Sequence, residues 1–183
     1  MTPRVAGGTR FLQLATLLIT VVIASGCVKQ PLLIPAEPAT IGPYSNFSAR
    51  LIAIEPKRRW QVILQWHADT PERGDLRLTH AASGTIVEFR WFGKRMQSRD
   101  NHSRLWKEVD AAQLATQGMV IPPQQLASIL LGEMPNHFIE KKPNLWESSA
   151  SGSLIRLQWK ASSKQLTMTD TKHGRQVKLL IQP

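Results

Sequence analysis

The sequence is short of cysteine and of acidic residues. Its only cysteine, Cys27, has no partner for a disulfide within the chain, so a fold of 183 residues must rest on its hydrophobic core. Aspartate and glutamate number 13 against 23 lysines and arginines, for a formal net charge of +10. An excess of this size is typical of a nucleic-acid binder, of a partner for anionic lipid, or simply of a basic surface.

Motifs of common catalytic and metal sites are also missing. The chain has no G-x-S-x-G, no phosphate-binding loop and no close pair of carboxylates worth pursuing. Its five histidines are scattered, with no pair at metal-ligand spacing beside cysteine or acidic residues. We therefore expect a protein that is not an enzyme and that holds no metal and no cofactor.

One long uncharged run is present, from residue 11 to residue 27, and Arg4 and Arg10 precede it. The run is short for a membrane-spanning helix, which needs about 20 apolar residues. A basic start, an apolar middle and small residues at the end are the order of an export signal. Ala24, Ser25 and Gly26 directly before the cysteine resemble the lipobox of bacterial lipoproteins. The alternatives are an ordinary cleaved signal, or an uncleaved anchor with a chance cysteine.

Residues 1–27 are thus expected to be a lipoprotein signal peptide with its lipobox. This resemblance implies cleavage before Cys27, which then carries lipid on its thiol and its new amino terminus. Loss of Arg4 and Arg10 would lower the charge from +10 to +8. By the sorting rule of such lipoproteins, Val28 in place of aspartate favours the outer membrane, at the periplasmic face of a Gram-negative bacterium. Export also argues against nucleic acid as a partner.

Residues 28–45 contain four prolines and no sustained periodicity, which predicts a flexible tether between lipid and domain. Period-two alternation dominates the remainder, residues 46–183, and predicts many short antiparallel strands with one apolar face each. Glycine-containing turn signals separate several of them. The clearest stretches are 59–67, 85–92, 153–161, 164–170 and 175–182, and weaker ones are 47–54, 74–80, 94–99 and 103–109.

The stretch from residue 118 to residue 135 breaks this pattern, because its apolar residues follow helical spacing. Pro122 and Pro123 suit a first helical turn, and Gly132 suits a helix end. A shorter helix is expected before it, where Asp110 and Gln113 have the spacing of a capping box. A sheet that curves only partway needs a lid, so we expect both helices to lie across its hollow. The alternative is an ordinary α+β core that encloses nothing.

The residues of this helical stretch resemble one family. The matching positions are Gly118, Met119, Ile121, Pro122, Leu126, Ile129, Leu130, Gly132 and Pro135. They are similar to the run G-M-P-I-P followed by L…W-I-L-G-L-P in the outer-membrane lipoprotein receptor LolB family. The stretches "FSARLIAI", "VILQW" and "LRLTHAASGTIVEF" also follow the order of that family, so the resemblance spans roughly residues 45–183.

The resemblance implies a mainly β domain with α: an antiparallel half-barrel of about eleven strands, LolB/LolA-like, capped by short helices. It also implies a lipid-anchored receptor that accepts lipoproteins from a periplasmic LolA-like carrier and inserts them in the outer membrane. The expected partners are that carrier, lipoprotein acyl chains and outer-membrane lipid, and we expect a monomer. An envelope scaffold of the same fold, without cargo transfer, is the alternative.

An acyl chain would need an apolar cavity between the sheet and the helices. Each candidate for its wall also suits an ordinary core. The candidates are Trp66, Phe89, Trp91, Leu126, Ile129, Leu130, Leu157, Trp159 and Met168.

One turn departs from the family pattern. In that family the turn after the strand that corresponds to residues 75–79 faces the membrane and carries an exposed bulky apolar residue, where this chain has Ala82, preceded by Ala81. Alanine offers far less apolar surface to a membrane. Either delivery works otherwise in this protein, or it binds lipid without delivering lipoproteins.

Overall fold

The computed structural model describes residues 40–103, 105–116 and 119–182. Over these residues the chain forms one sheet of eleven strands, two α-helices and a 3-10 turn. The strands are β1 (Asn46–Glu55), β2 (Arg58–Thr70), β3 (Arg73–His80), β4 (Thr85–Phe92), β5 (Arg95–Asp100), β6 (Lys107–Glu108), β7 (Ile139–Lys142), β8 (Leu145–Ser148), β9 (Ile155–Lys160), β10 (Gln165–Asp170) and β11 (Arg175–Ile181). The helices are α2 (Ala111–Thr116) and α3 (Pro123–Leu130), and η1 (Ala161–Ser163) is the 3-10 turn.

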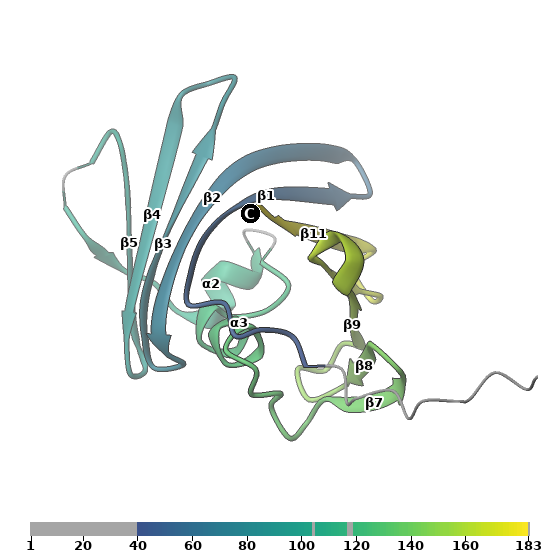
Figure 1. The fold of residues 1–183 in the computed structure, drawn as a ribbon. Helices are drawn as coiled ribbons and strands as arrows, with labels where there is room; N and C mark the ends of the chain where they lie inside the picture. The colour runs from purple at the N-terminus through teal and green to yellow at the C-terminus, as the bar shows by residue number, and fades with distance from the viewer. Residues whose placement is uncertain (1–39, 104, 117–118, 183) are drawn as a thin grey trace, which may run out of the picture. The chain divides into compact units, whose positions relative to one another are not determined.

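The strands are antiparallel, in the spatial order β6-β5-β4-β3-β2-β1-β11-β10-β9-β8-β7. The first six strands form a meander that ends at one edge, and the chain then crosses through α2 and α3 to the opposite edge. From there β7 to β11 return toward the centre, where β11 pairs with β1. The sheet curls without closing (Figure 1). This confirms the predicted class, a mainly β half-barrel of about eleven strands capped by short helices.

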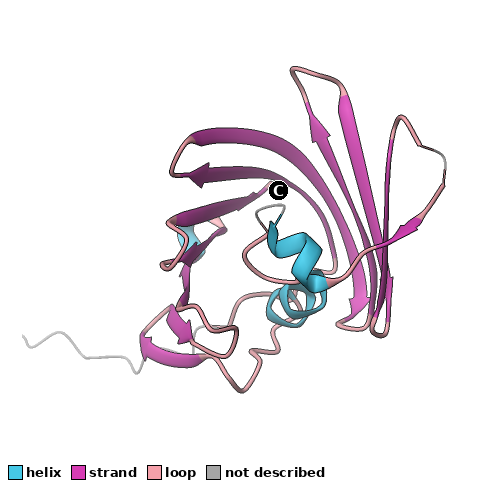
Figure 2. Ribbon diagram, turned by 180° about the vertical axis from the view of Figure 1, so that it is seen from behind, coloured by secondary structure: helices cyan, strands magenta, loops and turns pink. Residues whose placement is uncertain are grey.

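Alternation along the strands determines which face is buried. In β2, residues 60, 62, 64, 66 and 68 point into the hollow, whereas residues 61, 65, 67 and 69 are exposed. The helices lie inside the curve of the sheet, on the face that carries the apolar residues (Figures 1 and 2). The hydrophobic core is therefore the layer between the concave face and the helices.

Both predicted helices are present, and their ends follow the expected chemistry. The N–H of Gln113 donates to Oδ1 of Asp110 at 2.7 Å, and the N–H of Asp110 donates to Oε1 of Gln113 at 3.1 Å, which completes the capping box. Helix α3 begins at Pro123, where a missing N–H costs nothing, and Gly132 beyond its end has φ +96°. None of the helices among the described residues is long and apolar enough to cross a membrane.

The structure differs from the sequence expectations at two places. Strands β7 and β8 were not predicted, because a four-residue strand gives too short a pattern to recognise. Residues 40–45, assigned to the tether, pack on the domain instead: Ile41 is 2% exposed and belongs to the core.

Candidate functional site

An apolar cavity of about 180 Å³ lies between the concave face of the sheet and the segment that contains α2 and α3. Its walls carry no charged side chain, so it is a site for hydrocarbon and not for polar chemistry. The lining residues are Leu51, Trp60, Leu64, Leu76, Leu78, Val87, Phe89, Leu114, Met119, Val120, Ile121, Pro123, Leu126, Met168 and Val177.

Three of the nine predicted wall residues line this cavity: Phe89 from β4, Leu126 from α3 and Met168 from β10. They come from distant parts of the sequence, and the sheet brings them together because β4 and β10 lie on opposite sides of the central strands. Leu126 is the α3 residue that faces the space, at 8% exposure. The structure therefore contains an apolar pocket beneath α3, where the sequence predicted one.

The other six are buried in the core but do not line the cavity. They are Trp66, Trp91, Ile129, Leu130, Leu157 and Trp159. Aromatic packing explains the three tryptophans, which belong to a continuous row of rings. In that row Trp159 contacts Tyr44, Tyr44 contacts Phe47, Phe47 stacks on Trp66, and Trp66 contacts Trp91, with centroids 5.3–6.1 Å apart. The protein's own rings thus fill that part of the hollow.

Sequence reasoning missed most of the wall, although a signal for part of it was available. Trp60 and Leu64 stand on the same face of β2 as the predicted Trp66. Leu78 and Val87 are direct neighbours across β3 and β4, a register that no single-strand pattern reveals. Residues 119–121 line the cavity from the connection before α3, where helical spacing gives no information.

The cavity is smaller than a full acyl chain. An apolar cavity of about 150 Å³ takes up a benzene ring. A space of about 180 Å³ therefore accommodates about six carbons, fewer than half of a palmitoyl tail. A longer chain has either to extend beyond this space or to displace α2 or α3 from the sheet.

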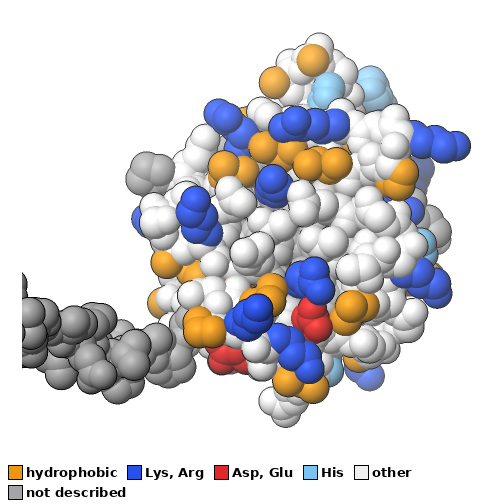
Figure 3. Space-filling view, turned by 90° about the vertical axis from the view of Figure 1, so that its right-hand side faces the viewer, with side chains coloured by type: hydrophobic (Ala, Val, Ile, Leu, Met, Phe, Trp, Pro, Cys, Tyr) orange, Lys and Arg blue, Asp and Glu red, His pale blue; other side chains and the backbone are white. Residues whose placement is uncertain are grey.

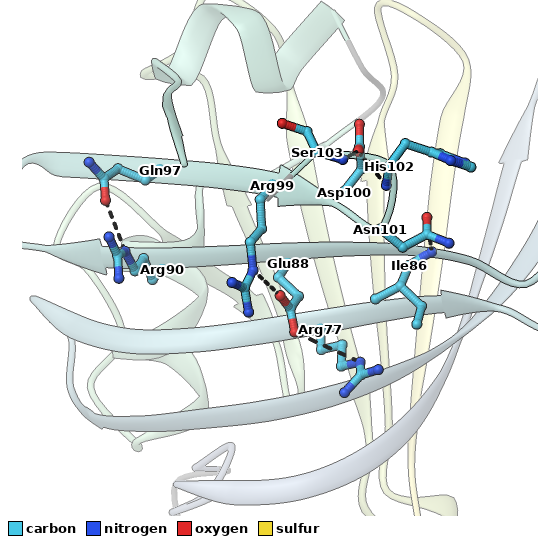
Figure 4. Close-up of polar contacts among 10 residues, drawn as sticks. All are labelled: Arg77, Ile86, Glu88, Arg90, Gln97, Arg99, Asp100, Asn101, His102 and Ser103. Atoms are coloured by element: carbon cyan, nitrogen blue, oxygen red, sulfur yellow. Dashed lines mark hydrogen bonds and ion pairs between the residues drawn. The ribbon is translucent and has the colours of Figure 1, made fainter. Parts of the chain in front are cut away.

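A second, larger hollow of about 850 Å³ lies on the opposite, convex face of β2 to β5. Charged side chains line it, among them five arginines: Arg73, Arg77, Arg90, Arg95 and Arg99. Glu88 pairs with Arg99 and lies 4.0 Å from Arg77, and Arg90 donates to Gln97 at 2.9 Å (Figure 4). The ring of Trp106 covers Arg90 and Arg99 at 4.2 and 4.6 Å. Such a groove suits anionic groups, not an acyl chain.

Basic side chains also predominate elsewhere on the surface. One face of the molecule shows lysines and arginines spread among few acidic side chains, with apolar groups between them (Figure 3). This distribution agrees with the excess of 23 basic over 13 acidic residues in the whole chain.

Buried Ser153 and Asp170 form a polar cluster with the half-exposed His173, and its composition is that of a catalytic triad. Its geometry is different, because the serine hydroxyl donates to Oδ1 of Asp170 while Nδ1 of His173 lies 2.6 Å from Oδ2. Burial of Asp170 raises the pKa of its carboxyl, but the hydrogen bonds from Ser153 and His173 outweigh it and hold the pKa below its ordinary value. In a catalytic triad the histidine lies between the serine and the carboxylate, whereas here the carboxylate lies between the other two groups. The cluster instead connects β10 to the loops beside it.

Two further predicted sites can be located only in part. Ala81 and Ala82 are exposed in the β3–β4 turn, where Nδ1 of His80 lies 2.9 Å from the hydroxyl of Ser83. Cys27, the signal segment 1–27 and residues 28–39 of the tether lie outside the described residues. Within the described residues, no three histidine, cysteine or acidic side chains are placed to share a metal ion.

Comparison of the sequence with known proteins finds no match: no protein-family model matches the chain, and no curated protein matches its sequence. The crystal structure of a LolA superfamily protein from Nitrosomonas europaea is similar over 78% of this chain and 86% of that one, at 10% sequence identity and a TM-score of 0.47.

Proposed function

We propose that this protein is a lipid-anchored outer-membrane receptor that accepts the acyl chains of lipoproteins from a periplasmic carrier and passes them to the outer membrane. The apolar cavity between the sheet and α3 is the observation that carries the proposal. The lipobox at Cys27 and the likeness of residues 118–135 to the LolB family support it. The catalytic and metal motifs sought in the sequence are missing, which agrees with a task that involves no covalent chemistry.

Transfer energetics require a cavity of this kind. Each methylene removed from water gains about 0.8 kcal/mol, so an acyl chain of about fourteen methylenes gains roughly 11 kcal/mol on leaving water. A carrier without an apolar site would have to overcome that whole cost in the aqueous periplasm. A receptor must also release its cargo, and therefore has to bind the chain less tightly than the membrane does.

The observed volume suits such intermediate affinity. A resting cavity for about six methylenes offers roughly 5 kcal/mol without rearrangement. Further methylenes enter only if α3 and the preceding segment move away from β2, β3 and β4. The free energy of that displacement lowers the net affinity for a long chain and favours release to the membrane.

The small volume also favours the alternative, an envelope scaffold with the same fold and no cargo. All nine predicted wall residues are core residues in this structure and six of them do not line the cavity, which is what a scaffold would need. The two functions differ in one property, because only a receptor must take up hydrocarbon reversibly.

Uptake of a fluorescent fatty acid by purified residues 28–183, which lack the anchor lipid, distinguishes them. A receptor binds the probe and releases it to excess palmitate. Val87→Phe, which fills the cavity from β4, should abolish uptake. Ile86→Phe is the matched control, because it adds a larger side chain at the next position on the opposite face. Equal uptake by both variants, or none by the wild type, would leave only the scaffold.

Depletion in cells tests the transfer step itself. Loss of a receptor should leave lipoproteins in the periplasm or the inner membrane, measured by fractionation of labelled lipoproteins. Unchanged sorting, together with reversible uptake in vitro, would make this a lipid-binding protein outside lipoprotein delivery.

A further inference from the structure

Large apolar side chains are exposed at three positions in the described part of the chain: Phe92 at 73%, Leu105 at 75% and Ile139 at 59%. Phe92 is the aromatic one, and it ends β4 at the turn into β5. A single exposed apolar side chain is common on a protein surface, so what distinguishes Phe92 is its fixed position and the charge around it.

The turn that carries Phe92 is held rigidly. The N–H of Gly93 donates to the carbonyl oxygen of Glu72 at 2.8 Å, and Nε1 of Trp91 donates to the carbonyl oxygen of Pro71 at 3.0 Å. These two bonds join the β4–β5 turn to the β2–β3 turn. The ring is therefore presented on a fixed double turn, and little conformational entropy is lost when it binds.

Charge around the ring identifies its partner. Arg73 is opposite Phe92 in the β3–β4 register, and Lys94 and Arg95 follow it in the chain. All three are exposed, whereas the acidic residues nearby are Glu72 on the joined turn and Asp69 at the end of β2, so positive charge still exceeds negative charge. An apolar ring surrounded by a net excess of positive charge matches a bilayer with anionic headgroups, where the ring enters the acyl boundary and the cations stay at the phosphates.

The basic surface continues beyond the tip. Phe92, Arg73 and Arg95 also line the groove on the convex face, and Arg90 and Arg99 extend it along the sheet. The start of β1 supports the same orientation, because Asn46 pairs with His67 at the end of the sheet that carries the β2–β3 and β4–β5 turns. The β3–β4 turn with Ala81 and Ala82 lies at the opposite end.

We propose that the tip formed by Phe92, Lys94, Arg95 and Arg73 docks on the anionic lipid surface of the membrane that anchors the protein. In this proposal the tip is the part that contacts the membrane, a role that the resemblance to the LolB family implies for the β3–β4 turn. The inference rests on the proposed membrane anchoring, but not on the proposed cargo. Docking of the tip also orients the half-barrel, because the membrane then lies at the end of the sheet where β1 begins.

Depth measurements on the full-length chain, anchored in vesicles by its own amino terminus, test the proposal. Phe92→Cys, Ala82→Cys and Leu105→Cys are each labelled with an environment-sensitive fluorophore, and the unsubstituted chain, whose Cys27 thiol carries the lipid, gives the background. In vesicles containing phosphatidylglycerol, we expect a blue shift and quenching by nitroxide lipids at position 92, and neither effect at positions 82 and 105. Adding Lys94→Gln and Arg95→Gln should reduce quenching at position 92 at least twofold.

Several results would overturn the docking surface. The first is absence of quenching at position 92, and the second is deeper quenching at position 82 or 105. The third is quenching at position 92 that changes neither when phosphatidylglycerol is omitted nor when Lys94 and Arg95 are replaced. A shift that rises with protein density at fixed lipid composition would identify a second copy as the occupant and would also overturn it. Fatty-acid uptake in solution is measured without vesicles, so failure of the tip and failure of the proposed function are separate outcomes.

Discussion

The backbone N–H of Tyr44 donates a hydrogen bond of 2.7 Å to the carbonyl oxygen of Leu130, in the last turn of α3. Carbonyls at a helix end have no partner within the helix, so this bond satisfies one of them. The segment before β1 thereby lies against the helix that covers the cavity, with Ile41 buried beside it. The chain therefore packs against α3 before it enters the sheet at β1.

This contact requires glycine at position 42. Gly42 has φ +113°, and a Cβ atom there would overlap the carbonyl oxygen of Leu130. Gly42→Ala should therefore lower the free energy of unfolding by more than the ~1–2 kcal/mol of a left-handed residue alone. Gly84→Ala is the matched control, because Gly84 also has positive φ but meets no atom within 4 Å. Denaturant titration measures both, and equal losses would contradict the close approach.

Leu126 and Leu130 are both buried core residues of α3. Leu126→Ala and Leu130→Ala remove the same atoms from one helix and should each cost about 2–5 kcal/mol of unfolding free energy. Only Leu126 lines the cavity. Fatty-acid titration should show tighter binding or longer accepted chains for Leu126→Ala than for Leu130→Ala. Indistinguishable binding would mean that this space is not where the probe resides.

Trp91 and Trp66 offer a comparison of two buried indoles. Nε1 of Trp91 donates to Pro71, whereas Nε1 of Trp66 has no hydrogen-bond partner within the described structure. Trp91→Phe should cost about 0.5–1.5 kcal/mol more than Trp66→Phe, since only the first loses a bond. Hydrogen exchange at the amide of Gly93 should also accelerate in Trp91→Phe alone. Unchanged exchange would show that the indole does not hold the double turn.

Asp170 predicts a dependence of stability on pH. Because its folded pKa is lowered relative to an unfolded value of about 3.9, the carboxylate stabilises the fold above pH 4, and this contribution disappears as pH falls through the folded pKa. Asp170→Asn should lose about 1–3 kcal/mol of unfolding free energy at pH 7. The difference from wild type should shrink below pH 4 in denaturant titrations. A constant difference down to pH 2 would exclude this origin.

Much of the fold was predictable because the alternation of apolar and polar residues along the sequence matches the faces that are buried and exposed in the folded sheet. Strand β2 alternates between buried and exposed positions over most of its length, and the Asp110–Gln113 capping box forms as its spacing indicates. The short edge strands were not predictable. In β7 all four residues are exposed, so there is no burial pattern for the sequence to show.

The cavity was predictable as a feature but not as a set of residues. Side chains at Trp66 and Trp159 follow the same alternation as Phe89 and Met168, yet only the second pair lines the space. The difference arises from Tyr44 and Phe47, whose rings occupy the hollow beside Trp66 and Trp159. Which ring fills which part of a hollow depends on contacts between distant segments, and periodicity along one strand carries no such information.

The two outermost strands of the sheet are short and charged, with Lys107 and Glu108 in β6 and Glu140, Lys141 and Lys142 in β7. Neither provides a long flat row of free backbone groups onto which a foreign strand could add. The edges of this sheet are therefore protected against the addition of a strand from a second copy or from another polypeptide.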